Sequence, residues 1–253
     1  MAKRGGAPRR PPRPGRPGGA GRTGGRASAP KTGAAKPSRP RSRTAPDAPA
    51  PSSPLPPGPF RLGAIPGATP GKWIDVWQER MPGVDLVLEP LAVAEQLHAL
   101  AERTVDAALV RLPLQADDVH VIRLYDEMPV VVAAAESHLT AADDLALADL
   151  AGEIVLTPRD DVLGVTVPGA VAPAFGAPAD TAEAIATVAA GVGVVIVPMS
   201  LARLHRRKDV EYRPLTDGPV STVALAWPVD DPSPFVETFI GIVRGRTANS
   251  SRD

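Results

Sequence analysis

The chain has 253 residues, contains no cysteine and balances 28 basic side chains against 28 acidic ones. Without cysteine, disulfides, thiolate catalysis, cysteine-based zinc sites and iron–sulfur clusters are excluded. The neutral total hides an asymmetry, because residues 1–58 carry 13 basic side chains and one acid, whereas residues 59–253 carry 15 basic and 27 acidic side chains. This division predicts a basic arm joined to an acidic body, and it favours an anionic partner for the arm or a contact between arm and body.

Residues 1–58 have a composition that disfavours regular structure. They include 14 prolines and 10 glycines and no aromatic side chain. Such a segment cannot bury enough apolar surface to offset its conformational entropy, so we expect a disordered arm. Since its beginning lacks the apolar stretch of a signal peptide and no apolar run reaches transmembrane length, we expect a cytoplasmic protein that makes no membrane contact.

The ordered part is expected to begin at Phe60, where strands and helices start to alternate. Apolar segments of strand length and segments of helical periodicity follow one another in the order 60–65, 69–81, 84–88, 92–103 and 106–110. Thr69 is expected to cap the first helix, with Pro70 at its first position. Apolar strands that alternate with helices are typical of a parallel sheet covered on both faces, so the pattern predicts an α/β fold.

The rest of the body continues with further strands and helices. Strands are expected near 121–124, 130–134, 153–157, 193–198 and 222–227, and helices near 142–150, 181–190, 200–208 and 234–246. The sequence from Asp180 to Glu183 resembles a capping box and predicts the start of the helix over 181–190, which ends at Gly191. Residues 158–178 are rich in Gly, Pro and Val and predict no regular element. Residues 247–253 are expected to form a disordered tail.

Several stretches, in their order along the chain, resemble the effector-binding domain of LysR-type transcriptional regulators. They are Leu62-Gly63-Ala64 leading into the helix at Thr69, RMPGVDLVLE (80–89), LHALAERTVDAALVR (97–111), VVVAAAESHLTAADDLALADLAG (130–152) and ATVAAGVGVVIVPMSLA (186–202). The winged helix-turn-helix that precedes this domain in the family has no counterpart here, and the basic arm stands in its place.

The resemblance implies a two-lobed type 2 periplasmic-binding-protein-like fold over residues 59–246. Lobe one is expected over 60–128 plus 229–246 and lobe two over 129–228, with two crossing strands between them. The resemblance also implies a ligand in the cleft between the lobes and a side-by-side homodimer. A cleft site agrees with the general rule that open parallel sheets bind ligands beyond the carboxyl ends of their strands.

The expected ligand-binding residues lie near strand ends. Gly67, Ala68 and Thr69 precede a helix N-terminus, whose unpaired N–H groups and dipole attract carboxylates or phosphates, and in the resembling family this loop contacts the effector. The Thr69 hydroxyl either binds the ligand or only caps the helix. Arg111, at the end of the third strand, pairs either with an anionic ligand or with a surface acid such as Asp117 or Asp118.

Three further residues complete this predicted site in the second lobe. Thr157 and Arg159 end the strand that opens lobe two, and each of them either contacts the ligand or serves the surface. Gly193 either permits close packing or reaches the cleft, which passes near that turn in the family.

The segment from His205 to Lys208 is a nucleic-acid patch or, more simply, a set of cations that favour the C-terminal end of a helix.

Catalytic and metal-binding patterns are missing from the sequence. The stretch GATPGK (67–72) is one residue too short for a phosphate-binding loop and is followed by Trp73 in place of Ser or Thr. The four histidines show no metal-ligand spacing, and no cofactor is expected. The sequence therefore predicts a protein that is not an enzyme.

The arm offers a candidate nucleic-acid site at Arg13, Arg16, Arg22 and Arg26. The stretch from Arg13 to Pro17 is similar to the core of an AT-hook, which places an arginine in the minor groove of A·T-rich DNA. Two other interpretations are salt-sensitive phosphate binding by many arginines, and a composition set by a GC-rich genome.

These observations predict a cytoplasmic sensor of a small, anionic metabolite that acts in transcription regulation. The basic arm or a DNA-binding partner protein would supply the contact with DNA. Two alternatives stay open: a protein associated with DNA or RNA through residues 1–58, with a vestigial cleft, and an enzyme on the same two-lobed scaffold.

Overall fold

The computed structural model describes residues 58–245. The predictions for the arm, including Arg13, Arg16, Arg22 and Arg26, and those for residues 247–253 lie outside the described residues. Among residues 58–245, no helix is both long and apolar enough to cross a bilayer.

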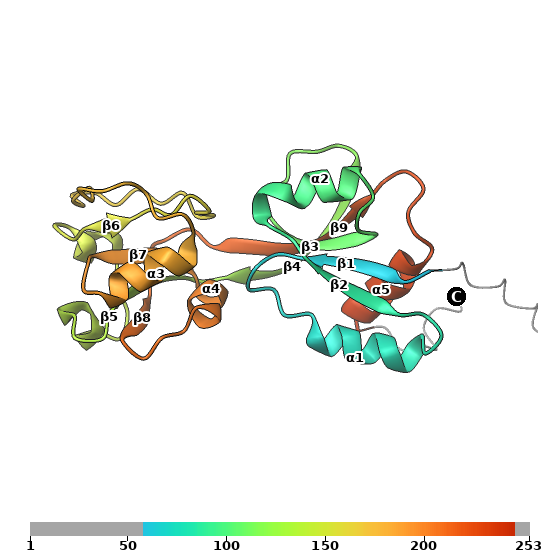
Figure 1. The fold of residues 1–253 in the computed structure, drawn as a ribbon, viewed down its shortest axis with the longest axis horizontal. Coiled ribbons are helices and arrows are strands. Elements are labelled where there is room, and N and C mark those ends of the chain that lie inside the picture. The colour runs from blue at the N-terminus through green and yellow to red at the C-terminus, as the bar shows by residue number, and fades with distance from the viewer. Residues whose placement is uncertain (1–57, 246–253) are drawn as a thin grey trace, which may run out of the picture. The chain divides into compact units, whose positions relative to one another are not determined.

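Two β-sheets with helices on their faces make up the two lobes (Figure 1). The first sheet has the strand order β2-β1-β3-β9-β4 and the second has the order β6-β7-β5-β8. The strands are β1 (Phe60–Ala64), β2 (Leu86–Pro90), β3 (Ala107–Arg111), β4 (Val119–Glu127), β5 (Pro129–Ala134), β6 (Val155–Leu156), β7 (Val194–Pro198), β8 (Val210–Pro214) and β9 (Ser221–Pro228). The helices are α1 (Gly71–Arg80), α2 (Gln96–Ala101), α3 (Thr181–Ala189), α4 (Met199–Leu204) and α5 (Phe235–Val243), with 3-10 turns at Val93–Glu95, His138–Ala141 and Leu147–Leu150.

The central strands β3 and β9 of the first sheet are buried on both faces because they are apolar at consecutive positions. On one face, Ala107 and Leu109 of β3 pack with α1 and α5, and on the other face Ala108 and Val110 pack with α2. The centre of the first face is aromatic, since Phe60 stacks on Trp77 with ring centroids 4.9 Å apart and Phe239 lies against both rings. Burial of one such side chain contributes roughly 1.5–3 kcal/mol.

The second sheet repeats this arrangement. Val130 and Val132 of β5 pack with α3 and α4, whereas Val131 and Ala133 face the 3-10 turns. Helix α3 begins where the sequence predicts it, because the Asp180 carboxylate accepts a hydrogen bond of 2.8 Å from the backbone N–H of Glu183.

The chain passes between the lobes twice, at the end of β4 and at the start of β9, and these two strands pair along their length (Figure 1). The expected division at residue 228 placed β9 in lobe two, but β9 pairs with β3 and β4 in the first sheet. The second lobe therefore ends before Ser221. An apolar strand pattern predicts a strand but not the sheet that it joins, since pairing depends on residues far away in the sequence.

Three local predictions also differ from the structure. The N-cap of α1 is Pro70, without a side-chain hydrogen bond, so Thr69 does not cap this helix. The region 142–150 holds only a 3-10 turn, and the helix expected over 200–208 ends at Leu204. The strand β8 follows after a turn over residues 205–209 and was not predicted, although Val210, Glu211, Tyr212 and Arg213 alternate between apolar and charged side chains.

Candidate functional site

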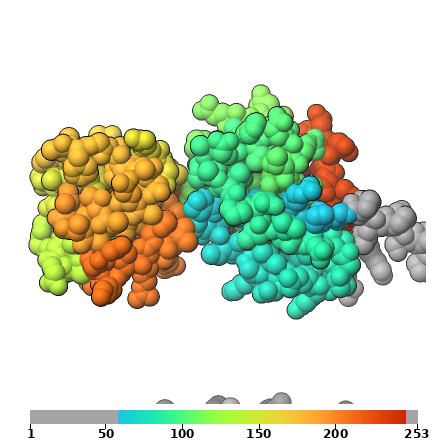
Figure 2. All heavy atoms as spheres, viewed as in Figure 1, coloured from blue at the N-terminus to red at the C-terminus, as the bar shows by residue number. Residues whose placement is uncertain are grey.

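A cavity of about 610 Å³ opens between the two lobes, whose separate masses and intervening indentation are visible in Figure 2. We call this cavity the cleft. Its lining comes from both lobes: Pro66, residues 92–94 and Arg111 from the first, and residues 159–162, residues 179–182, Leu201, Leu204 and His205 from the second.

The fold places these residues together because strand ends converge on the cleft. Pro66 follows β1, residues 92–94 follow β2, and Arg111 is the last residue of β3. In the second lobe, residues 159–162 follow β6, and residues 179–182 include the start of α3. Ligands of open α/β sheets bind beyond the carboxyl ends of the strands, so the cleft is the position at which this fold offers a site.

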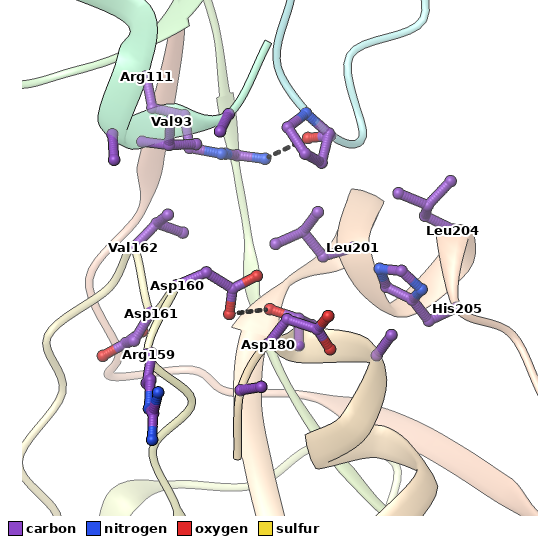
Figure 3. A pocket seen from close by; sticks show the side chains of 16 residues that line it. Val93, Arg111, Arg159, Asp160, Asp161, Val162, Asp180, Leu201, Leu204 and His205 are labelled. Carbon is purple, nitrogen blue, oxygen red and sulfur yellow. Dashed lines mark hydrogen bonds between the residues drawn. The ribbon is translucent and has the colours of Figure 1, made fainter. Parts of the chain in front are cut away.

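Carboxylates dominate the polar lining of the cleft on the side of the second lobe. Asp160 accepts a hydrogen bond of 2.9 Å from the Thr181 hydroxyl, and Asp160 and Asp180 lie near each other in Figure 3. Asp161 accepts from the backbone N–H groups of residues 163 and 164. Arg159, by contrast, points away from the other labelled side chains. The lining of this lobe is therefore acidic.

Arg111 stands at the opposite side of the cleft and is only 2% exposed. Its Nη1 donates to the Glu127 carboxylate and to the Ser221 hydroxyl, in both cases at 2.7 Å. Its Nη2 donates to the Ser200 hydroxyl at 3.2 Å and to the Pro66 carbonyl at 3.4 Å. Arg111 thus pairs with neither of the surface acids Asp117 and Asp118, because its partner is the buried Glu127 at the end of β4.

This network connects the two lobes. Ser200 of α4 also donates to the Glu127 carboxylate at 2.9 Å, so a residue of the second lobe shares both members of the ion pair. The amide of Gln96 fixes the backbone of Arg111 by two hydrogen bonds of 3.0 Å. Within the described part of the chain, the Nε of Arg111 is buried without a hydrogen-bond partner. Glu127 offsets the charge of the guanidinium before any ligand arrives.

A second hollow of about 640 Å³ adjoins the junction of the lobes, and we call it the junction hollow. Gly67 and Thr69 line this hollow, together with Tyr125 and Asp126. Burial raises the pKa of the Tyr125 phenol, and the nearby carboxylate of Glu127 adds to the rise. A hydrogen bond from the Thr222 hydroxyl, together with one from Arg123, lowers the pKa of Asp126.

Of the seven residues predicted to bind a ligand, only Arg111 and Arg159 line the cleft. Gly67 and Thr69 line the junction hollow, and Ala68 packs against the aromatic core. Thr157 borders only a gap of about 10 Å³. Gly193 packs against the backbone just before β6, where an added Cβ would lie 2.2 Å from the Ile154 carbonyl oxygen.

Most of the residues that line the cleft were not predicted from the sequence. Asp160 and Asp161 follow β6 by a few residues, and Asp180 is the N-cap of α3. The rule that strand ends face the site would have found the first two. Among residues 58–245, no group of His, Asp and Glu side chains could hold a metal ion.

A model of the LysR substrate binding domain matches residues 54–248, most of the chain. The chain belongs to the LysR substrate-binding-domain family. It is 31% identical over 170 residues to the HTH-type transcriptional regulator CatR of Pseudomonas putida, covering 63% of this chain and 58% of CatR. It is 30% identical over 184 residues to the HTH-type transcriptional regulator BudR of Raoultella terrigena, covering 65% and 60%.

The chain thus spans about three fifths of the length of these two relatives. Both are HTH-type transcriptional regulators, which agrees with the expectation from the sequence that this chain is not an enzyme.

Solved structures of LysR regulatory domains share the fold. The reduced form of the OxyR regulatory domain from Pseudomonas aeruginosa is 26% identical with a TM-score of 0.59, covering 74% of this chain and 97% of that domain. The BenM effector-binding domain with its effector benzoate is 19% identical with a TM-score of 0.60, covering 74% of this chain and 91% of that domain. These similarities confirm the predicted two-lobed, type 2 periplasmic-binding-protein-like fold.

Proposed function

We propose that this LysR-type domain senses a small organic effector in the cleft and serves transcription regulation. The observation that carries the proposal is the cleft itself, which lies at the carboxyl ends of the strands and has walls from both lobes. Its volume of about 610 Å³ is within the range of roughly 300–1,000 Å³ that small-molecule sites occupy. The membership in the family supports a regulatory role.

The charge of the effector is the point at which the proposal departs from the sequence analysis, which predicted an anion. Three carboxylates line the cleft, those of Asp160, Asp161 and Asp180. The charge of Arg111 is already offset by Glu127, and Arg159 points away. An anion would meet carboxylates without a free cation to balance them, whereas an ammonium or amidine group would gain favourable partners. We therefore propose an effector with a cationic group.

The shape of such an effector follows from the remaining lining. Val93 of the first lobe and Leu201 and Leu204 of the second line the same cavity as the carboxylates. Burial of apolar surface against these side chains contributes about 25 cal/mol per Å². The lining thus has an acidic part and an apolar part. An effector with an apolar body and a cationic group near Asp160 and Asp180 fits both parts.

A ligand that contacts both lobes favours the arrangement in which the lobes are closed around it. The ion pair of Arg111 and Glu127, with Ser200 bonded to both, lies where the chain passes between the lobes. A change in the angle between the lobes would act on this network first. This position makes the network the pivot of the proposed switch.

The experiment is thermal unfolding of the full chain against organic amines, organic acids and neutral analogues matched in size. A ligand at about one hundred times its dissociation constant adds about 2.7 kcal/mol to the free energy of unfolding. We expect amines to raise the melting temperature, and we expect Asp160→Asn and Asp180→Asn to reduce the rise. Asp143→Asn, an exposed carboxylate of the second lobe outside the cleft, is the control.

The outcomes separate the two parts of the proposal. If only acids raise the melting temperature, the sensor stands and the cationic effector is wrong. If none of a broad library raises it, the cleft is not an effector site.

Further partners are proposed for the basic arm and for the domain itself. The excess of 12 positive charges in residues 1–58 supports binding of DNA or RNA by the arm, or a place beside a DNA-binding partner protein. The family supports a homodimer, and its regulatory role supports a cytoplasmic location. Loss of DNA binding by residues 59–253 relative to the full chain tests the role of the arm.

A further inference from the structure

A groove of about 1,090 Å³ lies on the second lobe between α4, the turn after it and β8. We call it the basic groove, because five of its lining residues are cations: Arg203, Arg206, Arg207, Lys208 and Arg213. It shares no lining residue with the cleft. Helix α4 nevertheless borders both, since Leu201 and Leu204 line the cleft and Ala202 and Arg203 line the groove.

The concentration of cations in this groove is unusual for this body. Residues 59–253 carry 15 basic side chains against 27 acidic ones, and five of the 15 lie between residues 203 and 213. A uniform distribution would place about one there. The acidic body thus presents a positive face at one place on the second lobe, and a positive face attracts polyanions while the remaining surface repels them.

Two of the five cations have structural partners. Arg207 forms a forked ion pair with Asp209, with two hydrogen bonds of 3.0 Å. Arg213 donates to the Ala142 carbonyl at 2.7 Å and to the Glu211 carboxylate at 2.8 Å. These contacts attach β8 to its surroundings, and they explain why these two arginines are present.

The other three cations form no ion pair with a carboxylate within residues 58–245. They lie in the last turn of α4 or just after it, where the helix dipole favours a positive charge. Within the described part of the chain, the one hydrogen bond of the Arg203 side chain is to the Tyr212 hydroxyl, at 3.5 Å. Arg206 and Lys208 form no hydrogen bond or ion pair with any residue in the described range 58–245. Charges on an edge strand such as β8 prevent pairing with another chain, but Arg203 belongs to α4, and Arg206 and Lys208 belong to the turn.

We propose that the basic groove binds the phosphate backbone of duplex DNA through Arg203, Arg206 and Lys208. Phosphate oxygens are the usual partners of exposed arginine and lysine side chains, and such contacts position a protein on DNA without reading its sequence. DNA is favoured over an acidic protein segment because the proposed function in transcription places this domain near DNA, and in this respect the inference rests on that function. The cleft takes no part in it.

The test uses the salt dependence of DNA binding by the full chain. The affinity for a duplex of about 20 base pairs is measured by fluorescence anisotropy between about 50 and 200 mM salt, without an effector. The groove variant carries Arg203→Gln, Arg206→Gln and Lys208→Gln. Its control carries Arg61→Gln, Lys72→Gln and Arg244→Gln, which remove the same charge from exposed positions of the first lobe.

Each lost phosphate contact lowers the slope of log K against log salt by about 0.9, so the groove variant should lose about 2.7. Its loss of affinity should then be about 40-fold greater at 50 mM than at 200 mM salt. The control should keep the slope of the wild type. Because the arm is present in all three proteins, its contribution cancels in the comparison.

Equal slopes for the groove variant and the wild type would overturn the proposal, and so would an equal decrease in the control. Polyglutamate is added as a competitor of the labelled duplex at the same concentration of charge as unlabelled DNA. If it displaces the duplex as effectively as DNA does, the groove binds acidic proteins instead. If the triple variant does not fold, as judged by circular dichroism, Lys208→Gln alone should lower the slope by about 0.9. None of these outcomes depends on whether the cleft binds an effector, so the two proposals fail separately.

Discussion

The cleft and the basic groove lie on two sides of one short helix and carry opposite charge. The cleft has carboxylates at Asp160, Asp161 and Asp180, whereas the groove has five cations. A body with 12 more acids than bases therefore contains a strongly basic surface, and the net charge of a domain does not give the charge of its sites. The opposite charge of the two regions also separates their ligands. The groove repels a cation that would enter the cleft, and the cleft repels a polyanion that would bind the groove.

The two regions differ again in how their cations are used. The side chain of Arg111 at the cleft is buried and has hydrogen bonds to four residues, whereas that of Arg206 in the groove is exposed and has none among the described residues. The first cation belongs to the structure of the fold. The second is available to a ligand, and substitutions should show the contrast.

The largest effect is expected for Arg111→Ala. This substitution leaves the Glu127 carboxylate buried without its cation, which should lower the free energy of unfolding by about 3–5 kcal/mol in urea denaturation. Arg206→Ala removes the same charge from the groove and should change stability by no more than about 0.5 kcal/mol. Replacing the pair together, by Arg111→Met with Glu127→Leu, should cost less than Arg111→Ala. Equal losses for Arg111→Ala and Arg206→Ala would contradict the contrast.

An intermediate effect is expected at Gly193, which lines neither the cleft nor the groove. Its φ of 63° is in the left-handed region, and an added Cβ would lie 2.2 Å from a backbone oxygen that cannot easily move. Gly193→Ala should therefore lower the free energy of unfolding by about 1–3 kcal/mol and leave both ligand affinities unchanged. Gly241→Ala, where the Cβ of a helical residue meets open space, should stabilise by about 0.5–1 kcal/mol. If the Gly193→Ala protein folds but binds the effector with a changed affinity, Gly193 contributes to the effector site after all.

The smallest effect concerns Asp126, a carboxylate outside both regions. Hydrogen bonds from Thr222 and then Arg123 lower its pKa in the folded state, so its stabilising contribution is present above the pKa of the unfolded chain. That contribution is lost as the pH falls through the lower pKa of the folded state. Thr222→Val should weaken the loss of stability on acidification below about pH 5, measured by urea denaturation. Thr187→Val, whose hydroxyl donates to a backbone carbonyl, should keep the pH dependence of the wild type.

Most of the fold could be predicted because its determinants are local. Consecutive apolar residues in β3 and β7 indicated strands buried on both faces, and the Asp180 cap indicated the start of α3. The placement of β9 could not be predicted in the same way, since its partners lie about 100 residues or more away along the chain.

The site was less predictable, for a physical reason. Arg111 was correctly placed at the end of its strand, but its partner Glu127 is 16 residues away and its second contact, Ser221, is 110 residues away. Whether a charged side chain faces a ligand or a buried partner is decided by such distant contacts. The anionic effector was expected on the basis of Arg111 and a helix N-terminus, and it stays a prediction. Arg111 itself pairs with an internal carboxylate, that of Glu127.

Helix α4 has six residues, and its shortness couples the two regions that it borders. A rotation or translation of so short a rigid element moves all of its side chains together, so a displacement of Leu201 or Leu204 by an effector also displaces Arg203. Occupancy of the cleft and of the groove would then be coupled. By reciprocity, the factor by which an effector changes the affinity for DNA equals the factor by which DNA changes the affinity for the effector, so titrating either ligand in the presence of the other measures the same free energy.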